Sequence, residues 1–91
     1  MEYSVVVLPT AKKDLESLDP PWRARVIERL AWLAANADQV AHHRLQGVPD
    51  DLSRLCRFRV GDYRVLYWKI DPSRTIEVFH VEHRSKAYKK L

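Results

Sequence analysis

Apolar residues recur at helical spacing in the first half of the chain and at alternate positions in the second half. A β-branched, apolar run over residues 3–8 predicts a first strand, which Pro9 ends. The following apolar positions predict a short amphipathic helix through Ala11, Leu15 and Leu18. Asp19 as N-cap and Pro20 at the first helical position begin a longer helix over residues 20–37. Its apolar face should comprise Trp22, Val26, Leu30, Leu33 and Ala34.

The second half of the chain predicts a loop followed by three strands. Gly47 and Pro49 indicate a loop over residues 42–51. The alternating pattern after it predicts strands over residues 52–60, 63–70 and 75–83. A Gly61-Asp62 turn should join the first two strands, and a type I turn with Pro72 at its second position should join the last two. Connections this short make the strands antiparallel neighbours.

These elements predict a single α+β domain over residues 1–91. An N-terminal strand leads into a two-helix antiparallel hairpin, and a three-stranded antiparallel meander follows. The helices should cover one face of a mostly antiparallel sheet, which leaves the other face open. A short C-terminal helix or tail over residues 84–91 completes the expected fold.

Composition narrows the class of protein. Hydrophobic residues make up 46% of the 91 residues, enough for one core, and Cys56 has no second cysteine to pair with. A lone cysteine favours a reducing compartment, and neither a signal peptide nor a run of ~18 apolar residues is visible. We therefore expect a cytoplasmic protein that does not enter a membrane. The histidines lack metal-ligand spacing and the two glycines form no phosphate loop, so we expect no metal and no cofactor.

Basic residues are concentrated in the second half of the chain. Residues 1–43 carry a net charge of −1 and residues 44–91 a net charge of +5, which together give the net charge of +4. This asymmetry suits RNA, DNA or an acidic protein partner, although a solvated basic surface would show it as well.

Strand alternation gathers arginines on the open face of the predicted sheet. Arg57 and Arg59 share a face with Leu55, whereas Arg54, Cys56 and Phe58 share the other. Arg64 begins the next strand, and His83 and Arg84 end the last one. Tyr88 follows Arg84 by one helical turn if the tail is helical. Such a face could be a groove for a phosphate backbone, or a solvated surface with a packed terminal tyrosine.

Four segments, in order, resemble the RelE/ParE toxin superfamily of type II toxin–antitoxin systems. Residues 57–67 (RFRVGDYRVLY) are similar to its central hairpin, R-x-R-x-G-x-Y-R followed by an apolar strand. Residues 81–88 (VEHRSKAY) are similar to its terminal motif, a His-Arg or Lys-Arg pair with a tyrosine shortly after. Residues 45–47 (LQG) resemble its L-x-G segment, and Ala11 with Asp14-Leu15 fits its first helix. The resemblance spans nearly the whole chain and implies the RelE-like fold.

The resemblance to the RelE branch implies an endoribonuclease that cuts mRNA in the ribosomal A site without a metal. The ribose 2′-hydroxyl attacks the adjacent phosphate and the 5′-oxygen leaves, which requires a base, an acid and cations around the phosphorane. Arg64 and Arg84 match the phosphate-stabilising arginines of the family, and Tyr88 matches its catalytic tyrosine. The expected RNA- and phosphate-binding residues are Arg54, Arg57, Arg59 and Lys86.

One position departs from the family pattern and leaves the base open. RelE enzymes usually carry a lysine where this chain has Leu55, and arginine is too basic to replace it. Our hypothesis is that Tyr88 or His83 transfers the proton, since histidine titrates near neutrality and neighbouring arginines would lower the pKa of a tyrosine. His83 could equally be an ordinary histidine at a strand end.

Two other functions share the same expected fold. The ParE branch poisons DNA gyrase without cutting RNA, and a third possibility is a toxin-like protein that binds RNA or its partner without cleavage. The retained arginines and terminal tyrosine favour the RelE branch. Either branch implies a RelB-like or similar cognate antitoxin that wraps the toxin in a hetero-oligomer.

Overall fold

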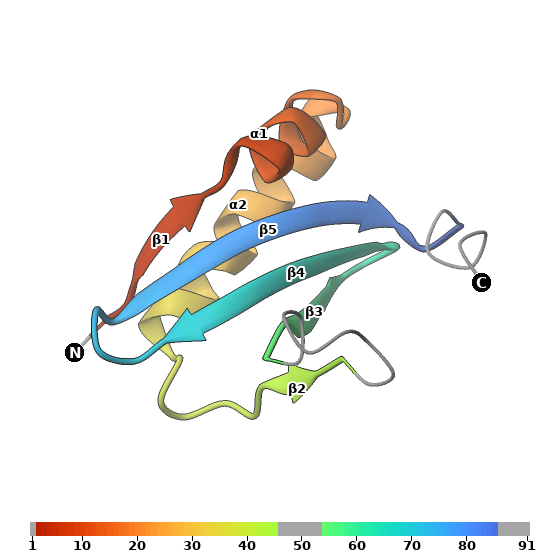
Figure 1. The fold of residues 1–91 in the computed structure, drawn as a ribbon. Helices are drawn as coiled ribbons and strands as arrows, with labels where there is room; N and C mark the ends of the chain where they lie inside the picture. The colour runs from red at the N-terminus through yellow and green to blue at the C-terminus, as the bar shows by residue number, and fades with distance from the viewer. Residues whose placement is uncertain (1, 46–53, 86–91) are drawn as a thin grey trace.

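The computed structural model describes residues 2–45 and 54–85, which form two helices and one five-stranded sheet (Figure 1). The strand order across the sheet is β1-β5-β4-β3-β2. All neighbouring strands are antiparallel except β1 and β5, which run parallel. The elements are β1 (Ser4–Val7), α1 (Pro9–Glu16), α2 (Pro20–Ala35), β2 (His43–Arg44), β3 (Cys56–Val60), β4 (Tyr63–Ile70) and β5 (Thr75–His83). This arrangement confirms the expected α+β class.

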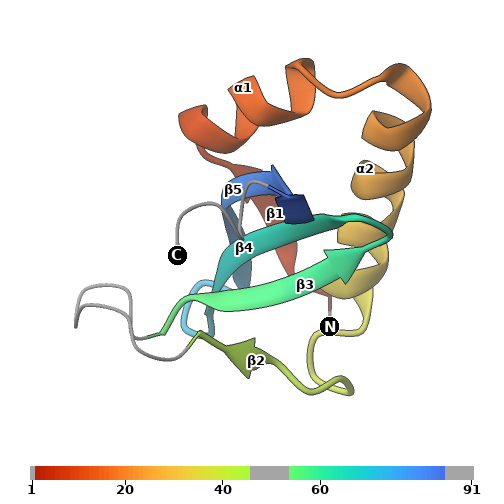
Figure 2. The same cartoon turned by 90° about the vertical axis from the view of Figure 1, so that its right-hand side faces the viewer.

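The core lies between the helices and one face of the sheet (Figure 2). Ala11 and Leu15 of α1 join the buried face of α2 in the same cluster. The α2 residues buried there are Val26, Leu30, Leu33 and Ala34, as the helical spacing predicts. Trp22, also expected on this face, is only half-buried and packs against Tyr63. Cys56 is buried in this cluster too, which confirms that it faces away from Arg57. Neither of the described helices is long and apolar enough to cross a membrane.

The longer helix ends two residues earlier than the spacing predicts. Helix α2 stops at Ala35, and Asn36 follows with φ −118° and ψ 18°. The Asn36 side-chain amide donates a hydrogen bond of 2.8 Å to the carbonyl of Trp32, which occupies an acceptor at the end of the helix. Ala37 is nevertheless buried, so an apolar residue is needed there for packing although the position lies outside the helix.

The predicted loop over residues 42–51 is partly wrong, because it contains β2. His43 and Arg44 pair with Arg57 and Cys56 at the edge of the sheet. A two-residue strand is too short to show an alternating pattern, so only the pairing reveals it. The next strand also begins later than expected, at Cys56, and Arg54 lies in a turn before it.

Both predicted turns are present and fix the antiparallel meander. Gly61 has φ +57° in the β3–β4 hairpin, a conformation that glycine adopts without a steric penalty. Between β4 and β5 the amide of Arg74 donates to the carbonyl of Asp71 at 3.1 Å, which places Pro72 at the second turn position. Arg74 itself has φ +50°, as expected for the left-handed residue that follows a type I turn in a longer hairpin loop.

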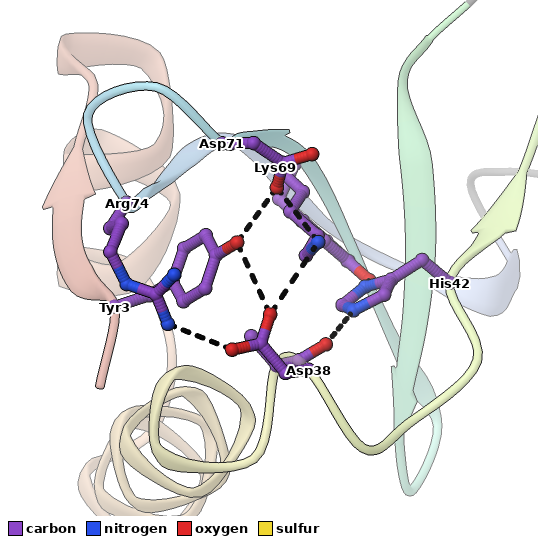
Figure 3. A network of polar contacts seen from close by, with 8 residues as sticks. Tyr3, Asp38, His42, Lys69, Asp71 and Arg74 are labelled. Atoms are coloured by element: carbon purple, nitrogen blue, oxygen red, sulfur yellow. Dashed lines mark hydrogen bonds and ion pairs between the residues drawn. The ribbon is translucent and has the colours of Figure 1, made fainter. Parts of the chain in front are cut away.

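A cluster of polar contacts connects Tyr3, which precedes β1, and Asp38, which follows α2, to the β4–β5 turn (Figure 3). The Tyr3 hydroxyl donates to Asp71 at 2.7 Å, Lys69 donates to the same carboxylate at 2.8 Å, and Arg74 donates to Asp38 at 2.8 Å. The hydrogen bond from Lys69, then that from Tyr3, lowers the pKa of Asp71. The hydrogen bond from Arg74 lowers the pKa of Asp38. These contacts close the end of the sheet that lies opposite the β3–β4 turn.

Candidate nucleic-acid interface

The β3–β4 hairpin presents arginines on the face of the sheet that α2 does not cover. Arg59 pairs directly with Arg64, and Arg57 pairs with Leu66 one step along the same face. The alternate residues Cys56 and Val60 are buried against the core. Alternation along β3 therefore separates cationic from apolar side chains, as the sequence predicts.

Four of the predicted basic residues line one cleft of about 500 Å³ near the β3–β4 turn. The cleft extends from β2 across β3 and β4 to the residue that follows β5. Its lining consists of Ala41, His43, Arg57, Phe58, Arg59, Asp62, Tyr63, Arg64 and Arg84. A concave surface with four guanidinium groups and one carboxylate is suited to an anion with several negative charges.

The charges in this cleft are only partly compensated. The Arg84 amide donates to the carbonyl of Asp62 at 2.8 Å, and the Arg84 Nε lies 3.9 Å from the Asp62 carboxylate. Arg64 forms an ion pair of 2.7 Å with Glu82. Among the ion pairs of residues 2–45 and 54–85, none involves Arg57 or Arg59. Two exposed guanidinium groups thus remain available to a ligand.

The structure does not bring His83 to the lining of this cleft. His83 pairs with Tyr63 across the sheet, and their rings meet edge to face at 5.2 Å. The amide of Ser85 donates to His83 Nδ1 at 3.2 Å. Val81, two residues earlier, is buried in the core, so His83 points to the core side of the sheet.

The other predicted site residues lie elsewhere or cannot be placed. Arg54 lines a separate cavity beside Trp68 and Glu77, at the far end of β4. Lys86 and Tyr88 lie outside the described residues. Leu55, the position of the family lysine, is only 1% exposed, so it adds neither charge nor a proton acceptor to the cleft.

Three polar residues beside the cleft were missed by sequence reasoning. Glu82 is 5% exposed and bonds to Arg64, His80 contacts Glu82, and Asp14 of α1 contacts His80. The sequence does not indicate that these three residues lie together, because their proximity depends on how α1 packs against β5. The sequence singles out Asp14 only because it fits the first helix of the RelE/ParE superfamily.

Comparison with known proteins shows the family of this chain. Residues 5–88 match the family described as ParE toxin of type II toxin–antitoxin systems, parDE. The chain belongs to the RelE/ParE superfamily of toxins. This confirms the resemblance drawn from the hairpin and terminal motifs.

Individual relatives of this toxin come from bacteria and archaea. It is 35% identical over 89 residues to the toxin RelE of Mycobacterium tuberculosis, which covers 96% of this chain and 87% of the relative. A chain in the M. tuberculosis RelBE2 toxin–antitoxin complex is 30% identical, with a TM-score of 0.79 over 93% of this chain and 94% of that one. A chain in the archaeal RelE–RelB complex from Pyrococcus horikoshii is 26% identical, with a TM-score of 0.71 over 94% and 99%.

Proposed function

We propose that this toxin is a ribosome-dependent endoribonuclease that cleaves mRNA in the A site and so inhibits translation. The observation that supports it is the cleft with Arg57, Arg59, Arg64 and Arg84. A site that holds four arginines along one face matches a scissile phosphate and its neighbours better than a single anion. Such a target would require a cytoplasmic location.

The proposed chemistry uses the arginines as fixed cations. Attack of the 2′-hydroxyl on the adjacent phosphate builds negative charge on the non-bridging oxygens, and guanidinium groups stabilise that charge. We assign this role to Arg64 and Arg84, and backbone binding to Arg57 and Arg59. Tyr88 remains the proposed proton-transfer group. His83 is the weaker candidate, because its ring packs on Tyr63 rather than lining the cleft.

We also propose a RelB-like antitoxin as the partner of this toxin. The M. tuberculosis and P. horikoshii relatives are seen in complexes with their antitoxins. A basic cleft with two uncompensated arginines would attract acidic residues of a wrapping segment, which would keep the toxin inactive until the antitoxin is lost.

The nuclease function is tested by primer extension on an mRNA in a purified translation reaction. The wild-type toxin should produce new 5′ ends within codons in the A site, and none on mRNA without ribosomes. Arg64→Ala and Arg84→Ala should each reduce the cleavage rate by about 100-fold, the usual effect of removing one oxyanion-stabilising donor. Arg25→Ala is the matched control, because it removes an exposed arginine of α2 that lies over the Trp22 ring.

Inhibition of DNA gyrase is the second candidate function. The observation that favours it is that the family matched by residues 5–88 is described as ParE toxin, and the ParE branch poisons gyrase. Loss of gyrase supercoiling activity with intact mRNA in the translation reaction would replace the nuclease proposal by this one. If the toxin affects neither gyrase nor mRNA, it acts by binding alone.

A further inference from the structure

A buried carboxylate lies directly beside one arginine of the cleft. Glu82 pairs with Arg64 across β4 and β5, and its Oε1 accepts a hydrogen bond of 2.7 Å from an Arg64 terminal nitrogen. The Glu82 side chain is 4% exposed, whereas that of Arg64 is 34% exposed. The carboxylate therefore holds the arginine from the neighbouring strand, and of the two residues only Arg64 lines the cleft.

The contact continues through a histidine to the first helix. His80 Nε2 lies 3.2 Å from Glu82 Oε2, and His80 Nδ1 lies against the Asp14 carboxylate. Asp14 Oδ2 also accepts a hydrogen bond of 3.0 Å from the Val81 amide, which anchors it to the edge of β5. The chain Asp14–His80–Glu82–Arg64, here called the relay, thus joins α1 to the cleft.

The relay lacks the arrangement of a metal site. Asp14 and Glu82 contact opposite nitrogens of the imidazole, so the three groups are arranged in a line rather than around one point. Among the described residues, no three His, Cys, Asp or Glu side chains are placed to hold a metal ion. A linear chain of polar contacts instead orients the group at its end.

Glu82 is also badly placed to act as the general base. A base must reach the proton that it removes within hydrogen-bond distance. Glu82 is absent from the cleft lining, its side chain is almost fully buried, and its two oxygens already contact Arg64 and His80. A ribose hydroxyl in the cleft would meet the Arg64 guanidinium first.

We propose that Glu82, His80 and Asp14 are positioning residues that hold Arg64 in the orientation that stabilises the scissile phosphate. This inference rests on the proposed nuclease function. A free arginine has many rotamers, and fixing one of its nitrogens before RNA arrives removes that ordering step from the reaction. The hydrogen bond to Glu82 uses one of the five N–H donors of the guanidinium and the Nε–H is buried, so N–H donors of the terminal nitrogens remain for phosphate.

The kinetic test is a double-mutant cycle in the ribosome-bound cleavage assay. Glu82→Gln should lower the cleavage rate at saturating ribosome by about tenfold and Glu82→Ala by about 100-fold, with little change in the half-saturating ribosome concentration. Asp14→Asn keeps an acceptor for the Val81 amide and should give a smaller loss. In an Arg64→Ala background, Glu82→Gln should have no further effect.

The matched control is Glu77→Gln, which changes a glutamate of the same strand that lines a separate cavity beside Trp68. It should cleave at the wild-type rate. A further loss from Glu82→Gln in the Arg64→Ala background would show that Glu82 acts independently of the arginine. A faster rate or tighter binding in Glu82→Gln would show that the carboxylate masks Arg64 instead, and either result overturns the proposal.

An NMR measurement keeps this inference separate from the nuclease function. The Nε–H resonance of Arg64 in labelled toxin should shift and broaden in Glu82→Gln and in Asp14→Asn, but not in Glu77→Gln. If wild-type toxin cleaves no mRNA while the Arg64 resonance responds in this way, the nuclease proposal fails and the relay stands as a device that orients Arg64 for another anion. An unchanged Arg64 resonance in Glu82→Gln refutes the relay, whatever the activity.

Discussion

Replacing Arg59 by glutamine should make the fold more stable while it lowers the activity. Arg59 and Arg64 occupy directly opposite positions of β3 and β4, where Cβ atoms of an antiparallel pair lie about 5 Å apart. Arg57 follows on the same face, about 7 Å along the strand. Three like charges therefore share a small area of the sheet, and Glu82 compensates only Arg64 directly.

The size of the effect follows from this arrangement. Like charges at opposite positions cost roughly 0.2–1 kcal/mol, so we expect Arg59→Gln to raise the free energy of unfolding by about 0.5 kcal/mol. For a domain of this size, that corresponds to a Tm higher by about 2–4 °C. Because the gain is electrostatic, it should disappear in about 1 M salt, where charges are screened beyond ~3 Å.

Thermal unfolding followed by circular dichroism, at low and at high salt, measures this gain. Lys12→Gln removes an exposed positive charge from α1, far from the cleft, and should change Tm little at either salt concentration. The same Arg59→Gln protein loses one charged contact to the RNA backbone, worth about 1.5 kcal/mol, and should cleave mRNA about tenfold more slowly below saturating ribosome. A Tm of Arg59→Gln below that of the wild type at low salt would refute the reasoning. Arg59 would then stabilise the fold, and its position would be explained without a bound ligand.

Three further predictions concern the stability of the fold. Gly61→Ala should lower the free energy of unfolding by about 2 kcal/mol in urea titrations, because φ is +57° and an added Cβ would lie 2.6 Å from an indole ring; an unchanged midpoint would show that the turn relaxes. Tyr67→Phe should cost about 1 kcal/mol by the same assay, since it removes a hydroxyl that bonds to His42 Nδ1 at 2.6 Å. The lowered pKa values of Asp38 and Asp71 predict stability that is complete above the ordinary carboxyl pKa of about 4 and lost as the pH falls below it. Replacing both aspartates by asparagine should reduce this loss of unfolding free energy at acid pH. An unaltered dependence of the unfolding free energy on pH would assign the loss to other carboxylates.

Local chemistry was sufficient to predict most of the elements. Helical spacing located the buried face of α2, and Gly61 and Pro72 located both turns of the meander. It could not locate β2, because His43 and Arg44 become a strand only by pairing with β3. Nor could it reveal that β1 lies parallel to β5, since that pairing joins residues more than 70 positions apart.

The arginine side of the candidate site was likewise predictable, because alternation along β3 requires only a local register. The position of the Glu82 carboxylate was not predictable, because the pairing of β5 with β4 changes register beside Leu66 and Tyr67. Before this irregularity the even-numbered Ile76 and Val78 face the core, and after it the odd-numbered Val81 does. Alternation carried through β5 without the irregularity would have placed Glu82 in the core.

The sequence by itself therefore determined the superfamily, the order of elements and the row of arginines on one strand face, since each depends on residues close together in the chain. Only the tertiary structure decided that His83 packs against Tyr63 instead of lining the cleft. It alone also placed Asp14, 67 residues before Val81, at the edge of β5 beside His80. The physical reason is that side-chain periodicity reports one element at a time, whereas the environment of Arg64 arises where a helix and two strands pack together.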